Sequence, residues 1–177
     1  MNGDAAAARL APVTEPDVGA LRSFYDDVFD EVYRYAIRLT GGDAAAAEDL
    51  VHEAFVGLVC AWRDGRVDRL EIGWVVTVTR QRFLDGLRRR SREARRLQVV
   101  AAERPPAEVD PTDAEGALTL LARLPDRMRA ALVLRYVDDL AVPGVAAAMG
   151  LSIHATESLL ARGRARLRLL IEEQHHG

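Results

Sequence analysis

Apolar side chains recur at steps of three and four residues along most of this sequence, and that spacing constrains the possible folds. In the first such segment they fall at Val18, Leu21, Tyr25, Val28, Val32, Tyr35 and Leu39. Steps of this kind gather apolar side chains on one face of an α-helix that packs on other helices. No segment shows a convincing β-strand alternation. The sequence therefore predicts an all-α protein.

Boundary residues divide the first part of the chain into three predicted helices. Gly41-Gly42 ends the first helix, and Asp43 caps the second. The second helix ends near Asp64-Gly65, and a third begins near Ile72 and runs into an arginine-rich segment.

Four further helices are predicted in the second part of the chain. One begins at Asp113, and Pro125 lies in the first turn of the next, whose inward face includes Tyr136. Pro143 suits the first turn of a short helix. The last helix follows Gly150.

The periodicity stops between these two parts. The stretch "AAERPPAEVDPTD" contains three prolines and no apolar period, which is typical of a flexible linker. We predict a disordered tail (1–16), a three-helix domain (17–97), a linker (98–112) and a four-helix domain (113–173). Domains of about 80 and 60 residues are small for independent cores. We therefore expect them to pack on each other or on a partner.

The charges of the chain are unevenly distributed. Its basic residues are all arginine, and the net charge is −3. Residues 80–96 hold eight arginines and two acidic residues, a net +6, and residues 151–168 hold four arginines and one glutamate, a net +3. The other 142 residues therefore carry −12. This pattern predicts two polyanion contacts and an acidic surface suited to a basic protein partner.

Several functional classes receive no support from the sequence. The single cysteine, Cys60, excludes an internal disulfide, fits a cytoplasmic protein and is expected to be buried. "HEAFV" has Val56 where a zinc protease motif requires a second histidine, and His175-His176 is a weak metal candidate. No apolar run is long enough to span a membrane. We expect no catalytic residue, cofactor or metal.

The segment "VAAAMGLSIHATESLLARGRARLR" is typical of a helix-turn-helix. Ala146 permits close helix crossing, Gly150 permits a left-handed turn, and Ser152 can cap the second helix. Such a helix reads bases with its N-terminal part and contacts phosphates further along. The side chains expected to contact DNA are Ser152, His154, Glu157, Ser158, Arg162 and Arg164. The alternative for the arginines near the C-terminal end of this segment is that they form a solvated helix face.

Longer segments resemble one family. "FYDDVFDEVYRYAIRLTGGDAAAAEDLVHEAF" and "WVVTVTRQRFLDGLRRRSR" resemble region 2 of bacterial sigma factors. "LARLPDRMRAALVLRYVDDLAVPGVAAAMGLSIHATESLLARGRARLR" resembles region 4. The small size and the absence of a middle domain are similar to the extracytoplasmic-function (ECF) group, over about residues 20–172.

The resemblance implies a factor that binds core RNA polymerase and directs it to promoter DNA. Region 2 would engage the polymerase clamp helices and open the minus-ten element, and region 4 would bind the flap and read the minus-thirty-five element. An anti-sigma factor is a further expected partner. The residues implied in core binding are Glu48, Asp49, His52, Glu53 and Phe55. Those implied in contacts with the melted strand are Arg80, Arg82, Arg88, Arg89, Arg90 and Arg92.

Some positions depart from the family pattern and keep alternatives open. Gly144 and Gly163 stand where the family often has Glu and Ala, and each would weaken a helix by up to about 1 kcal/mol relative to alanine. Glu157 and Leu159 stand where basic residues are common, which indicates an unusual base preference. A helix-turn-helix regulator that acts without polymerase, or a degenerate sigma-like protein without initiation activity, remains possible. The acidic and arginine-rich faces could also be ordinary solvated helix surfaces.

Overall fold

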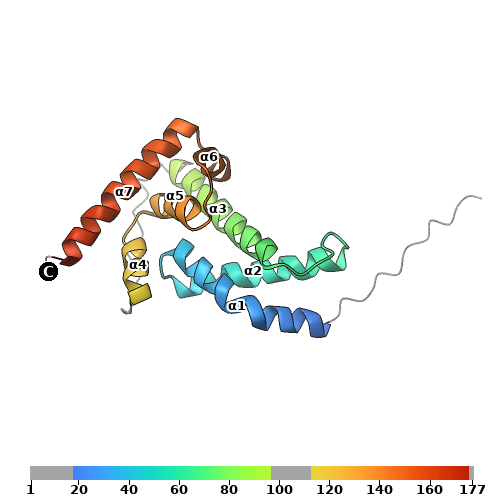
Figure 1. Cartoon of the computed structure of the whole chain (residues 1–177). Helices are drawn as coiled ribbons and strands as arrows, with labels where there is room; N and C mark the ends of the chain where they lie inside the picture. Colours follow the sequence, from blue (N-terminus) through green and yellow to red (C-terminus); the bar gives the residue numbers. More distant parts are fainter. Residues whose placement is uncertain (1–17, 97–112, 176–177) are drawn as a thin grey trace, which may run out of the picture.

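The computed structural model describes residues 18–96 and 113–175, and these residues form helices joined by short turns (Figure 1). The predicted tail (1–16) lies outside the described residues, as does the predicted linker (98–112). The predicted all-α fold is confirmed, since the described residues contain no strand. The helices are α1 (Val18–Thr40), α2 (Ala44–Arg63), α3 (Ile72–Arg96), α4 (Asp113–Ala122), α5 (Asp126–Tyr136), α6 (Val142–Met149) and α7 (Ile153–His175).

The first domain is a three-helix unit of α1, α2 and α3. Gly41 and Gly42 adopt positive φ angles of 70° and 85° and so end α1 where the sequence predicted. The Asp43 carboxylate then accepts a hydrogen bond from the backbone N–H of Ala46 at 3.1 Å and caps α2. Side chains of all three helices form one apolar cluster, which includes Val32, Val51, Leu58 and Val75.

In the second domain, α5 lies at the centre. Its residues from Arg129 to Leu134 are all buried, so this helix has no solvent-facing side over that stretch. Such burial on every face requires neighbours all around, and α5 packs against α6 and α7 of its own domain and against α1 and α3 of the other. Tyr136, predicted to point inward, is 59% exposed. That prediction was wrong because α5 ends at Tyr136 and the neighbouring helices do not cover it.

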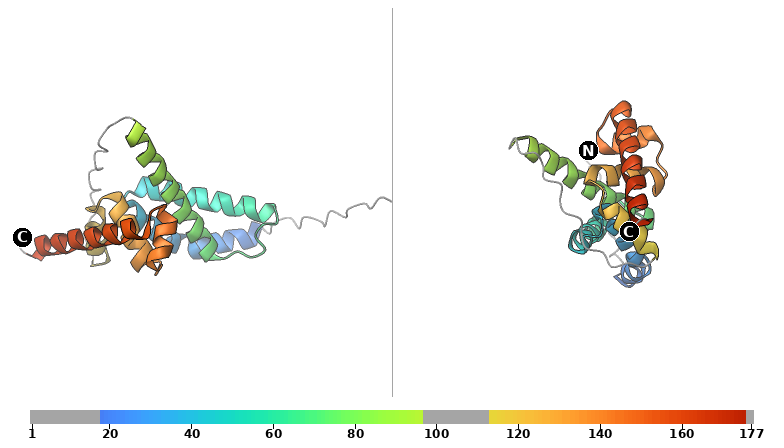
Figure 2. Two further views of the ribbon diagram at one scale, coloured as in Figure 1. Left: turned by 90° about the horizontal axis from the view of Figure 1, so that it is seen from above. Right: turned by 90° about the vertical axis from the view of Figure 1, so that its left-hand side faces the viewer.

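The two domains share a core. Tyr35 and Leu39 of α1 and Leu84 of α3 belong to the same buried cluster as Leu132 of α5 and Met149 of α6. Figures 1 and 2 show α5 beside α1 and α3, and α6 beside α3. Mutual packing, one of the two arrangements expected for such small domains, is therefore present. We call this arrangement the closed form, and the contact between the domains the seam.

Cys60 is exposed on α2, so the prediction that it fills the core was wrong. The apolar stretch around it belongs to a helix with one buried face, and Cys60 lies outside that face, whereas Leu58 and Ala61 lie within it.

Candidate promoter and polymerase surfaces

The α6–α7 pair has the geometry of a helix-turn-helix. Gly150 ends α6 in the left-handed conformation, with φ of 64°, and its N–H bonds back to the carbonyl groups of Ala146 and Ala147. Ser152 Oγ accepts a hydrogen bond from the N–H of Ala155 at 3.1 Å, and so caps α7 as predicted. The hydroxyl of the buried Thr156 donates to the carbonyl of Ser152 at 2.9 Å. These bonds fix the angle at which α7 leaves the turn.

The start of α7 presents a polar face to solvent. All the side chains predicted to contact DNA from this helix are exposed: Ser152, His154, Glu157, Ser158, Arg162 and Arg164. Ile153 is exposed beside them, at 52%. On the opposite side, Thr156, Leu159 and Leu160 are buried against the rest of the domain. The helix therefore has a free face of the kind that reads a major groove.

Gly163 lies where α7 crosses α5 closely. It is buried, and a Cβ atom placed on it would lie 3.3 Å from Cγ of Leu132. By contrast, a Cβ on Gly144 would have ordinary contact, at 3.5 Å from Leu140. The two unexpected glycines therefore differ, because only Gly163 permits a close helix approach.

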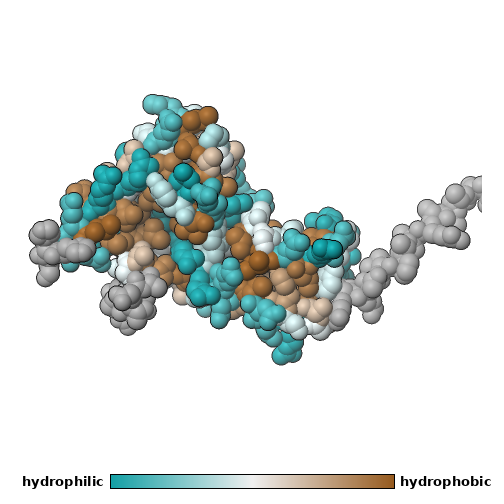
Figure 3. All heavy atoms as spheres, in the orientation of Figure 1, coloured by the Kyte–Doolittle hydropathy of each residue, from teal (hydrophilic) through white to brown (hydrophobic). Residues whose placement is uncertain are grey.

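The acidic face of α2 is largely exposed. Glu48, Asp49, His52 and Glu53 all face solvent, whereas Phe55 is only 7% exposed. The Phe55 ring instead packs on that of Tyr25, with a centroid distance of 4.6 Å. Phe55 thus contributes to the core beneath this face. Figure 3 shows brown apolar areas on the surface of the first domain. Val56 of α2 is 48% exposed and is an apolar surface residue that the sequence analysis did not identify.

The six α3 arginines predicted to contact DNA fall into three sets. Arg80, Arg88 and Arg90 bond to the second domain, through Asp138, the carbonyl of Ala148 and Asp126 respectively. Arg82 lies 3.8 Å from Glu53 and so joins the acidic face of α2. Arg89 and Arg92 are exposed and form no ion pair with any described residue. The helix brings the six predicted DNA-contacting arginines together, but half of them contact the seam in the closed form.

Comparison with known proteins assigns both domains. The family model of sigma-70 region 2 matches residues 24–93, and that of sigma-70 region 4 matches residues 115–167. The ECF RNA polymerase sigma factor SigL of Mycobacterium tuberculosis is 30% identical over 179 residues, which cover 94% of this chain and 97% of SigL. The chain belongs to the sigma-70 family, in its ECF group. A sigma factor directs promoter-specific transcription initiation, so this chain is an initiation factor rather than a member of an enzyme family.

Other relatives and a solved structure agree with this assignment. SigE of Mycolicibacterium smegmatis is 34% identical over 148 residues, which cover 78% of this chain but 56% of SigE. The chain therefore spans just over half of that relative. The sigma factor RpoE of Bartonella quintana, solved with the anti-sigma factor NepR, has a TM-score of 0.55 and 24% identity, over 88% of this chain and 98% of RpoE. That similarity shows the shared fold.

Asp138 of region 4 accepts two hydrogen bonds from region 2. The Tyr35 hydroxyl donates to its Oδ2 at 2.9 Å, and Nη1 of Arg80 donates to the same oxygen at 3.1 Å. The Asp138 side chain is only 8% exposed. Burial raises the pKa of the Tyr35 hydroxyl far above its usual range, and the negative charge of Asp138 raises it further. Tyr35 therefore remains a protonated donor at neutral pH.

Arg129 is the main seam residue that sequence reasoning missed. It is 4% exposed, and its guanidinium donates to the carbonyl groups of Leu39 at 2.9 Å and Leu124 at 3.0 Å and to Asp126 at 2.6 Å. Gly41 gives it room, since a Cβ there would lie 2.5 Å from Nη1. No local sequence signal marks Arg129, because its key acceptor is 90 residues away in the chain.

Among the described residues, no helix is long and apolar enough to cross a membrane. The same residues bring together no group of three or more side chains of the types that hold metal ions.

Proposed function

We propose that this sigma factor binds core RNA polymerase and directs it to promoters whose minus-thirty-five element is read by α7. The observation that carries the proposal is the exposed polar start of α7, held by the Ser152 cap and the buried Thr156, in the same chain as region 2. Ser152, His154, Glu157 and Ser158 would contact bases, and Arg162 and Arg164 would contact phosphates. A glutamate in this position can accept a hydrogen bond from a cytosine amine.

Region 2 would supply the polymerase contact and the minus-ten contact. The exposed carboxylates of Glu48, Asp49 and Glu53 suit a basic protein surface, and His52 and Val56 add contact area beside them. Phe55 would act from beneath by fixing the position of α2. The α3 arginines would bind the melted strand, whose phosphates require cations.

The closed form would have to open for both promoter elements to be bound. The two elements lie about 25 base pairs apart, or about 85 Å at 3.4 Å per base pair. Two packed domains of this size have centres only about 25 Å apart. The 16 residues from 97 to 112 can span at most about 55 Å. Separation would thus be within reach of the covalent chain, and it would release Arg80, Arg88 and Arg90 from the seam.

We propose an anti-sigma factor as a further partner and the cytoplasm as the place of action, since core polymerase and promoter DNA are found there. The solved complex of RpoE with NepR is an example of such a partnership for a protein of the same fold. A partner that holds the seam shut would keep three α3 arginines occupied.

Run-off transcription with purified core polymerase on genomic fragments tests the proposal. We expect products that depend on the full chain and that disappear when Ser152, His154 and Glu157 are together replaced by alanine. DNA binding without polymerase binding would instead favour a helix-turn-helix regulator. Polymerase binding without any promoter-dependent product would favour a degenerate sigma-like protein.

A distance measurement tests the opening. Cys60 is exposed on α2 and is the only cysteine, so Ala165→Cys on α7 provides a second labelling position in the other domain. We expect the distance between spin labels at these positions to increase when core polymerase and promoter DNA are added. An unchanged distance in a transcribing complex would contradict the proposed opening.

A further inference from the structure

A pocket opens at the seam between region 2 and region 4. Its walls come from α3 (Leu84, Leu87, Arg88, Ser91 and Arg92), from Arg127 of α5, and from Met149 and Gly150 at the helix-turn-helix turn. Its volume is about 290 Å³, at the lower end of the range for small-molecule sites. Because both domains line it, this pocket exists only in the closed form.

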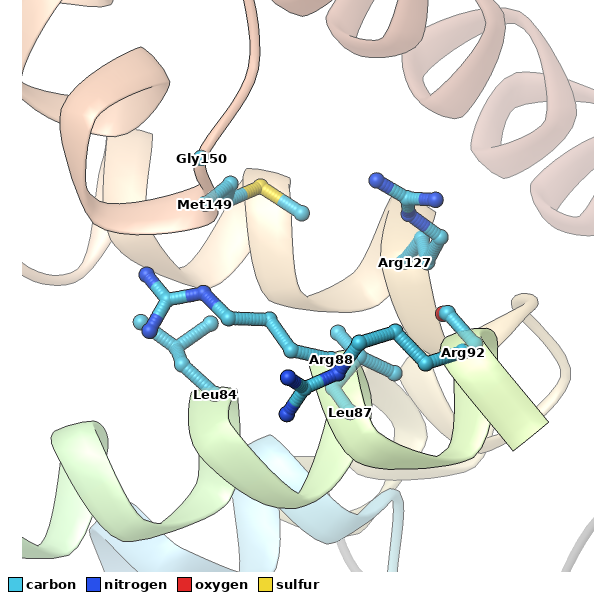
Figure 4. Close-up of a pocket in the computed structure, with 8 residues that line it drawn as sticks. Leu84, Leu87, Arg88, Arg92, Arg127, Met149 and Gly150 are labelled. Carbon is cyan, nitrogen blue, oxygen red and sulfur yellow. The ribbon is translucent and has the colours of Figure 1, made fainter.

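Three arginines surround the pocket. Figure 4 shows the side chains of Arg88 and Arg92 extending from α3, and that of Arg127 on α5 above them. Arg88 bonds to Asp85 at 2.7 Å and to the carbonyl of Ala148. Arg92 and the half-buried Arg127 form no hydrogen bond or ion pair with any other described residue. Two arginines therefore line the same pocket without a counter-charge among the described residues.

Nearby carboxylates do not balance this charge. Asp85 bonds to Arg88, and Asp126 bonds to Arg90 and Arg129. The three arginines that line the pocket therefore have one paired carboxylate among the described residues, that of Asp85, which leaves an excess of two positive charges. Arg127 also lies in the first turn of α5, where the helix dipole disfavours a cation. A bound anion would relieve both sources of repulsion.

Apolar side chains from both domains also line the pocket. Leu84, Leu87 and Met149 are buried members of the shared core, and their side chains border the same space. An arginine guanidinium can donate two parallel hydrogen bonds to the oxygens of one phosphate. An apolar wall suits a flat ring or another nonpolar group. A ligand that fits both halves carries phosphate at one end and an apolar or planar group at the other.

We infer that this pocket binds a small phosphate-bearing molecule of the nucleotide class and that the ligand holds the sigma factor in its closed form. Duplex DNA fits less well, because a site built from both domains is lost when they separate over a promoter. The link to regulation rests on the proposed opening, but binding itself does not. A ligand that binds the closed form and not the separated form increases the fraction of molecules in the closed form. The size of this shift is set by the difference between its affinities for the two forms.

Isothermal titration of the full chain, without polymerase, tests binding. The probes are GTP, ATP and inorganic pyrophosphate, with guanosine and adenosine as ligands that lack phosphate. We expect one site, tighter binding of a nucleotide than of pyrophosphate, and at least tenfold weaker binding of the nucleosides. Arg127→Gln and Arg92→Gln should each weaken nucleotide binding about tenfold, the usual loss for one charged hydrogen bond.

A matched control is Arg22→Gln, which removes an exposed arginine from α1, outside the pocket, and should leave binding unchanged. Arg92 and Arg127 have no partner among the described residues, so their variants should unfold at the wild-type temperature. Absence of nucleotide binding, or equal binding by wild type and Arg127→Gln, overturns the inference. Binding of hexaglutamate in preference to every nucleotide also overturns it, in favour of an acidic peptide.

The labels at Cys60 and at Ala165→Cys test the conformational part. A saturating nucleotide should reduce the increase in distance caused by polymerase and promoter DNA, and Arg127→Gln should restore it. If the nucleotide binds but the distance distribution is unchanged, the ligand does not hold the closed form and that part of the inference is wrong.

Discussion

Arg129 in region 4 donates a hydrogen bond from Nε to the main-chain carbonyl of Leu39 in region 2, at 2.9 Å. This buried charge lies where α1 ends at Gly41, so a side chain of one domain satisfies the helix terminus of the other. The bond therefore couples the stability of the two domains.

Arg129→Met should lower the free energy of unfolding by about 3–5 kcal/mol, because it removes one partner of a buried pair and leaves Asp126 and three carbonyl groups without this donor. Denaturant titration measures the loss. The matched control is Arg123→Met, which removes a partly exposed pair with Glu173 and should cost less than about 1 kcal/mol. Equal losses in the two variants would contradict a special role of Arg129.

Asp138→Asn should shift the population toward separated domains. The amide keeps the shape of the carboxylate but removes the charge that holds Arg80, and a hydrogen bond to a charged group contributes about 1.5–3 kcal/mol. We expect a larger label distance between Cys60 and Ala165→Cys, and tighter promoter binding by the free chain. Asp139→Asn is the control, because Asp139 is almost fully exposed and pairs only within region 4. An identical effect of both variants would argue against the seam as the cause.

The two unexpected glycines should respond differently to alanine. Gly144→Ala should stabilise the protein by up to about 1 kcal/mol, since the helix gains propensity and the new methyl group has room. Gly163→Ala should be neutral or destabilising by about 1–2 kcal/mol, because its methyl group would press on the buried Leu132. Urea titration of both variants gives the comparison. Equal stabilisation would show that α7 can move away from α5 at little cost.

Arg89 offers a test of DNA contact that leaves the seam intact. It is exposed and unpaired among the described residues, unlike its neighbours Arg88 and Arg90. Arg89→Ala should weaken promoter binding and reduce the slope of log K against log salt by about 0.7–0.9. Stability should remain within about 0.5 kcal/mol of wild type. The same slope change in Arg22→Ala would mean that general charge, and not a phosphate contact, is responsible.

Glu157→Lys should change which promoters are bound. The exposed carboxylate would be replaced by a cation, which prefers a guanine edge or a phosphate to a cytosine amine. Selection of binding sites from random DNA should show a changed preference in the minus-thirty-five element. Gln174→Lys adds a lysine near the far end of α7 and should leave the preference unchanged. An unaltered sequence preference in Glu157→Lys would show that Glu157 does not contribute to base recognition.

Much of the local structure could be predicted from neighbouring residues alone. The end of α1 at Gly41-Gly42, the Asp43 cap and the Ser152 cap all depend on backbone preferences within a few residues, which a sequence displays directly. The free face of α7 was also predictable, because helical spacing separates Thr156, Leu159 and Leu160 from the exposed positions. Cys60 and Tyr136 were misplaced because apolar composition does not say where neighbouring elements end.

The sequence by itself determined the helices, the family and the uneven charge of this protein. Only the tertiary structure decided that Asp138 meets Tyr35, 103 residues earlier, and that Arg129 meets Leu39. Helical periodicity predicts which face of a helix is buried, but it does not identify the helix that packs against that face. Partner choice depends on shape and on the satisfaction of buried polar groups across distant segments. For that reason the seam, its arginine-lined pocket and the engagement of Arg80 and Arg88 became visible only in the folded molecule.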